Sequence, residues 1–106
     1  MKDILFSGNA AGVLISSDGF GNATFLNIQS VNGVYKHLIF TNKNTFVTVD
    51  SVQVEGGAGP FDLIFLFLNF QSLTLNDLSI FDAQNIRGII SATGSTIYST
   101  IEASNW

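Results

Sequence analysis

Few side chains in this sequence could carry out acid–base or nucleophilic chemistry. His37 is the only histidine, and the chain has no cysteine. A Ser-His-Asp triad would have to use His37, but no Gly-x-Ser-x-Gly segment is present to supply a serine nucleophile. We therefore expect His37 to be a surface or hydrogen-bonded structural residue. The sequence predicts no catalytic residue and no enzymatic activity.

The carboxylates are scattered along the chain, without the close pair that glycoside hydrolysis requires. Asp18 with Asn22, and Asn76–Asp77 with Asp82, could supply oxygen ligands to calcium in a loop. The same residue types form turns without a metal, and the spacing of an EF-hand is absent. A zinc site would need three carboxylates beside the single histidine. We therefore expect no metal and no cofactor, with calcium binding kept as an alternative.

Carbohydrate-binding modules stack sugar rings on exposed tyrosine and tryptophan side chains. Tyr35, Tyr98 and Trp106 are the candidates in this chain, against ten phenylalanines. Phenylalanine has no polar group and suits cores and dry interfaces better. We expect Trp106 to pack against its own domain or a neighbouring protein, and a carbohydrate-binding module remains an alternative function.

The composition is unusual in its lack of charge. Charged residues make up 11% of the 106 residues, and the net charge is −4, whereas globular domains average about 25% charged residues. No basic stripe is present to bind nucleic acid or an anionic membrane surface. Because a neutral polar surface repels other copies weakly, the composition predicts a homo-oligomer, with a trimer as our estimate, or a subunit of a larger protein assembly.

No segment has the properties of a targeting or membrane-spanning sequence. Met1–Gly8 is too short for a signal peptide, and the longest apolar run, Leu63–Leu68, is far shorter than the roughly 20 residues of a membrane helix. The localisation stays open on this evidence, and a virion reached after cytoplasmic synthesis is one destination that fits.

Short β-rich runs alternate with turn residues along the whole chain, and no helical period persists. The segment Phe61–Phe70 is apolar on both faces, which is typical of a strand covered on both sides. This pattern predicts an all-β fold: an antiparallel β-sandwich or small barrel, Greek-key or jelly-roll-like, of about 8–9 short strands.

The sequence also contains an approximate repeat. Phe25–Val31 returns as Phe67–Leu73, 42 residues later, and Ile39–Phe40 matches Ile80–Phe81 at an offset of 41. A period of this size indicates a duplicated supersecondary unit. We predict a single domain over residues 1–106, built from repeat units of roughly 13–50 and 52–92.

Two local features give sharper predictions. Asn32–Gly33 between two β-rich runs predicts a type I′ turn, which would join the flanking strands as a tight hairpin. In the predicted strand Thr45–Val54, the apolar parity changes between Val49 and Val52, which predicts a bulge near Ser51.

The most economical function for such a chain is structural. Small β-sandwiches that are poor in cysteine and charge include phage capsid decoration, head-fibre and tail-adaptor subunits, so we expect a non-enzymatic virion component. Its apolar strand and its C-terminal tryptophan would be covered by partner protein. The interface candidates are Phe61, Ile64, Phe65, Leu66, Phe67, Leu68 and Trp106.

Overall fold

The computed structural model describes residues 1–8 and 10–100, with side chains described as far as residue 97. These residues form seven strands and no helix. The strands are β1 (Lys2–Ser7), β2 (Ala10–Asp18), β3 (Asn22–Val31), β4 (Val34–Asn42), β5 (Phe46–Glu55), β6 (Phe61–Phe81) and β7 (Ile86–Thr100).

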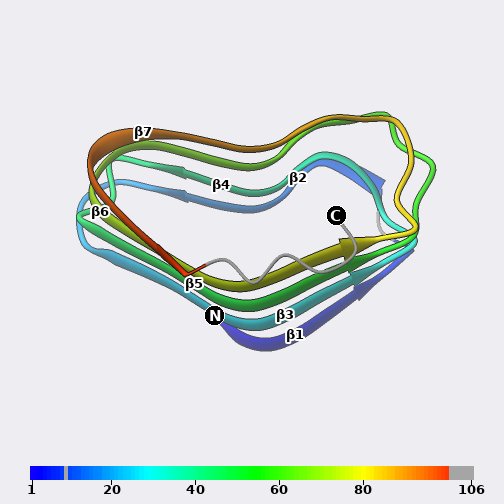
Figure 1. Cartoon of the computed structure of the whole chain (residues 1–106), viewed down its shortest axis with the longest axis horizontal. Helices are drawn as coiled ribbons and strands as arrows, with labels where there is room; N and C mark the ends of the chain where they lie inside the picture. Colours follow the sequence, from blue (N-terminus) through cyan, green and yellow to red (C-terminus); the bar gives the residue numbers. More distant parts are fainter. Residues whose placement is uncertain (9, 101–106) are drawn as a thin grey trace.

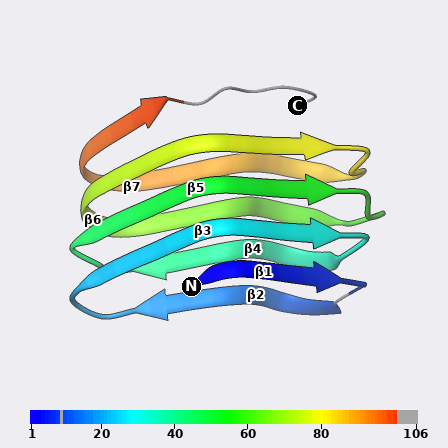
Figure 2. The ribbon, with the colours of Figure 1, turned by 90° about the horizontal axis from the view of Figure 1, so that it is seen from below.

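All strand pairs are parallel, and the chain winds into a β-solenoid of about four turns. Successive turns, here called coils, stack along one axis with β1 and β2 at one end and β7 at the other (Figure 2). The antiparallel β-sandwich or barrel expected from the sequence, Greek-key or jelly-roll-like, is therefore wrong. Alternation of apolar and polar residues shows that one face of a strand is buried, but it does not show which strand lies beside it.

Each coil passes once through a lower sheet and once through an upper sheet, as Figure 1 places them. The lower sheet contains β1, β3, β5, residues 72–81 of β6 and residues 96–100 of β7. The upper sheet contains β2, β4, residues 61–68 of β6 and residues 86–94 of β7. β6 and β7 are long because each runs from the upper sheet into the lower one.

Side chains at equivalent positions of successive coils stand in columns. In one column of the lower sheet, Ile4 lies beside Ile28, then Val52 and then Leu78. Equivalent residues in this column are therefore 24 or 26 positions apart. Such a column stacks aliphatic side chains along the axis, and burying each one stabilises the fold by about 1.5–3 kcal/mol.

The 42-residue duplication is not the structural repeat. Phe25 belongs to β3 in the lower sheet, whereas Phe67 belongs to the upper-sheet part of β6. The matching segments are thus alike because both bury one face in the same core, while they lie in opposite sheets.

The core fills the space between the two sheets. It is almost entirely aliphatic and phenylalanine, with Tyr35 as the one large polar exception among the described side chains. The buried residues are Ile15, Ala23, Phe25, Ile28, Tyr35, Leu38, Ile39, Val47, Val49, Val52, Val54, Phe61, Ile64, Phe65, Phe67, Phe70, Leu73, Leu75, Leu78 and Ile80.

Four strands of the lower sheet, β1, β3, β5 and β6, bend at equivalent positions, as Figure 1 shows for β1, β3 and β5. The residues at the bends have φ between 53° and 60°, a left-handed conformation that asparagine and aspartate adopt more readily than other side chains. They are Asp3, Asn27, Ser51 and Asp77. The bulge predicted near Ser51 is wrong, because the register of β5 with β3 and β6 continues there without a shift. The change of parity arises instead from a left-handed bend, which recurs in β1, β3, β5 and β6.

The hairpin predicted at Asn32–Gly33 is wrong. A type I′ turn needs positive φ at both central residues, and here Asn32 has φ +50° while Gly33 does not lie in that region. The flanking strands β3 and β4 do not pair with each other, because the chain turns there from the lower sheet to the upper one. Gly33 is required for a different reason: a Cβ at this position would lie 2.6 Å from the Tyr35 ring.

Candidate functional site

Four of the seven interface candidates lie inside the solenoid. Phe61, Ile64, Phe65 and Phe67 are at most 2% exposed, and they pack in the core of the chain itself. Because the coil closes on its own upper and lower sheets, their burial needs no partner protein.

The remaining candidates have different positions. Leu66 and Leu68 are half-buried on the outer face of the upper sheet, where Leu66 stands beside Phe40. Trp106 lies outside the described residues. The hypothesis of a contact with partner protein therefore applies to Leu66 and Leu68 alone among the described candidates.

His37 has a structural position in the upper sheet. Its Nδ1–H donates a hydrogen bond of 2.5 Å to the main-chain carbonyl of Leu63 on the next coil. Its ring lies 6.4 Å from that of Phe40, centroid to centroid. The expectation of a hydrogen-bonded structural histidine is thus confirmed.

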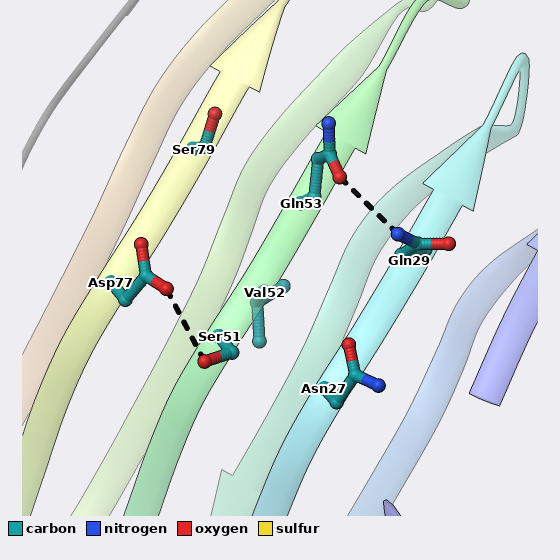
Figure 3. A pocket seen from close by; sticks show the side chains of 7 residues that line it. All are labelled: Asn27, Gln29, Ser51, Val52, Gln53, Asp77 and Ser79. Atoms are coloured by element: carbon teal, nitrogen blue, oxygen red, sulfur yellow. Dashed lines mark hydrogen bonds between the residues drawn. The ribbon is translucent and has the colours of Figure 1, made fainter. Parts of the chain in front are cut away.

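A polar groove of about 340 Å³ runs over the bend of the lower sheet. Amide, hydroxyl and carboxylate side chains from three coils line it, and Figure 3 shows them pointing outward from β3, β5 and β6. Its lining residues are Asn27, Gln29, Ser51, Val52, Gln53, Asp77 and Ser79.

The side chains of the polar groove bind one another along the solenoid axis. Gln29 Nε2 donates to Gln53 Oε1 at 3.3 Å, and Ser51 Oγ lies 3.2 Å from Asp77 Oδ2 (Figure 3). Ser51 Oγ also lies 3.1 Å from Asp50 Oδ1, so its one proton is shared between two carboxylate acceptors. These contacts tie neighbouring coils together and leave amide and hydroxyl groups at the surface. The only ionisable side chain that lines the groove is Asp77.

A second hollow, of about 330 Å³, lies on the outer face of the upper sheet. Arg87 in β7 forms an ion pair of 2.6 Å with Asp62 in β6, and Lys36 in β4 also lines the hollow. The three charges alternate in sign from coil to coil. Because Arg87 is 76% exposed, this pair is mostly solvated and adds little to stability.

No metal centre is evident in the described part of the chain. Within residues 1–8 and 10–100, no three side chains of His, Asp or Glu gather closely enough to hold an ion. The residues considered as calcium ligands lie in different parts of the coil. Asp18 and Asn22 flank the corner between β2 and β3, whereas Asp77 lies in the bend of β6.

The two ends of the solenoid have strand edges without a strand partner in the described chain. Across residues 1–8 and 10–100, β1 pairs only with β3, β2 only with β4, and β7 only with β6. Leu5 in β1 is 61% exposed and Val13 in β2 is 39% exposed. Unpaired edges of this kind present rows of N–H and C=O groups to any chain that can add a strand.

The corner between β2 and β3 presents a further apolar side chain. Phe20 is 93% exposed and stands between Gly19 and Gly21, whose φ angles are +118° and +113°. Neither the open ends nor this corner could be found from the sequence, because exposure there depends on which residues begin and end a coil.

Comparison with known protein families, with curated proteins and with solved structures finds no match to this chain. Among the described residues, no helix has the length and apolar character needed to cross a membrane.

Proposed function

We propose that this chain is a non-enzymatic structural module that works by associating with further copies of itself. The observation that carries the proposal is the pair of open ends, where strand edges of the described chain face solvent, together with the apolar side chains Leu5 and Val13 at the first-coil end. Solenoids with a solvated end normally cover it with a polar or charged cap. β2 has no lysine, arginine or proline to block strand addition.

The low charge of the whole chain supports the same proposal. With 11% charged residues, only weak repulsion opposes contact between copies. The expectation of a phage virion component, by contrast, rested on composition together with a β-sandwich architecture. Since the fold is a parallel solenoid, the architectural support for it is removed.

Sedimentation velocity of the purified chain tests this function. We expect the average mass to rise with concentration between about 1 μM and about 1 mM, because the copies associate through surface that each one exposes. A constant monomer mass over the same range would contradict the proposal.

The polar groove supports a second candidate function, the binding of a neutral carbohydrate. Gln29, Gln53 and Ser79 offer uncharged hydrogen-bonding groups in a hollow of about 340 Å³. No aromatic ring lines the groove to stack on a sugar, which makes this the weaker candidate. Isothermal titration of neutral oligosaccharides would measure binding directly, and a Gln53→Ala variant should abolish it.

A further inference from the structure

We propose that copies of this chain stack head to tail, with β2 of one copy added as a parallel strand to the free edge of β7 of the next. This inference rests on the proposed function and adds its geometry: which edges meet, in which direction and in which register. The occupant of the open end is a second copy, because the register of the coils makes the two ends complementary.

The inward columns of the upper sheet continue across such a contact. Ile15 stands beside Ile39, then Phe65 and then Ile90, so that isoleucine occupies both terminal positions of this column. Adding β2 of a second copy to β7 in the same register would place its Ile15 beside Ile90. This column would then continue into the second copy without a polar interruption.

The apolar side chains nearest the two ends are the less buried members of the core. The partly buried side chains that pack against it include Ile4, Phe6 and Leu14 from the first coil and Ile86, Ile89 and Ile90 from the last. A stacked copy would cover both sets together, and removal of apolar surface from water is the main driving force for association.

The column of charged side chains on the outer face of the upper sheet is also compatible with a stacked second copy. Lys36, Asp62 and Arg87 follow one another on successive coils, and the register places Gly12 of the first coil in the same column. In the stack, Gly12 of the second copy would stand beside Arg87. Because glycine has no side chain, this position brings no like charge against Arg87.

The direction of stacking follows from the strand pairing. Each β2–β7 contact would be parallel, as every pair within the chain is. A head-to-head contact would instead oppose two first coils in antiparallel fashion, and its columns could not match. Because head-to-tail contact leaves one free edge at each end, it predicts an open chain of copies in place of a closed trimer.

Lysine substitution at the edge tests the contact. Val13→Lys adds a charge to β2 at the proposed interface, while Val34→Lys adds the same charge to the second coil at a site with similar exposure, 44% against 39%. We expect Val13→Lys to weaken association at least about tenfold in sedimentation experiments. Val34→Lys should leave association near that of the unmodified chain. Equal effects of the two substitutions would overturn the proposed contact.

Cysteine cross-linking tests the register and the direction, and it does not depend on the lysine variants. A mixture of the Gly12→Cys and Arg87→Cys variants should form a disulfide dimer on oxidation, since neighbouring strands lie about 4.8 Å apart and disulfides join Cα atoms about 4.4–6.8 Å apart. Gly12→Cys alone should stay unlinked. A mixture of Ser16→Cys with Arg87→Cys, which is out of register, serves as the second control.

The results separate the two proposals. If the unmodified chain stays monomeric, the proposed function fails and this inference fails with it. If the chain associates but Gly12→Cys links to itself, or the mixed pair does not link, the function stands and the head-to-tail geometry is overturned.

Discussion

Ser30 Oγ lies 2.8 Å from the phenolic oxygen of Tyr35, across the corner where the chain passes from the lower to the upper sheet. Both side chains are at most 2% exposed. The ring of Tyr35 also meets that of Phe61 edge to face, with centroids 5.1 Å apart. The two buried hydroxyls at this corner therefore form a hydrogen bond with each other inside the core.

Replacing Tyr35 by phenylalanine should destabilise the fold without disturbing its packing. The ring contact with Phe61 is retained, but the hydroxyl of Ser30 is left buried without its partner. We expect Tyr35→Phe to lower the free energy of unfolding by about 1–3 kcal/mol, measured by urea denaturation followed by circular dichroism. The double variant Tyr35→Phe with Ser30→Ala should lose less than Tyr35→Phe alone. A larger loss in the double variant would show that the hydroxyl pair is not the cause.

Stability should also fall at alkaline pH through Tyr35. Burial raises the pKa of the Tyr35 phenol above 10, and the hydrogen bond with Ser30 opposes this only in part. Since the folded state holds the proton more tightly than the unfolded state, the contribution is fully present below pH 10 and is lost as the pH rises through the higher pKa of the folded state. Tyr35→Phe should therefore show a shallower decline of unfolding free energy above pH 10 than the unmodified chain. Parallel declines would contradict this assignment.

The hydroxyl of Thr41 lies in the core without a hydrogen-bond partner among the described residues. The residue is fully buried in β4, and no hydrogen-bond partner reaches its Oγ1 in the described part of the chain. Thr41→Val keeps the shape and removes the unpaired group, so we expect the free energy of unfolding to rise by about 1 kcal/mol. Thr48→Val, on the outer face of β5, is the matched control and should change it by less than about 0.5 kcal/mol. A loss of stability in Thr41→Val would mean that the hydroxyl is satisfied, for example by a buried water.

The sequence allowed the all-β class to be predicted, but not the direction in which the strands pair. In the column formed by Ile28, Val52 and Leu78, the position stays apolar from coil to coil, but the residue type changes. A search for identical residues therefore misses the repeat of 24 to 26 residues. It detects instead the resemblance between Phe25 and Phe67, which belong to opposite sheets.

The candidate surface was harder to predict than the fold. The apolar run in β6 could belong to a core or to an interface, and only closure of the coil places Phe65 and Phe67 inside. The open ends leave no signal in the sequence, because Leu5 and Val13 resemble any other strand residue. What exposes them is the absence of a further strand beside β1 and β2 among residues 1–8 and 10–100.

The corners of the solenoid require residues in the left-handed conformation, and one of them is a lysine. Lys43 has φ +66°, and the equivalent corners of the neighbouring coils carry Gly19 and Asn69. A long side chain tolerates this conformation less well than glycine, at a cost of about 1–2 kcal/mol per residue.

Lys43→Gly should therefore stabilise the fold, although glycine is flexible in the unfolded chain and offsets part of the gain. We expect the free energy of unfolding to rise by about 0.5–1 kcal/mol in urea denaturation. Lys36→Gly, at an exposed position of β4 without positive φ, is the control and should lower it by about 0.5–1 kcal/mol. Equal losses in both variants would show that the corner at Lys43 is not strained. Opposite signs would establish the conformation of the corner as the cause, because the two substitutions remove the same side chain.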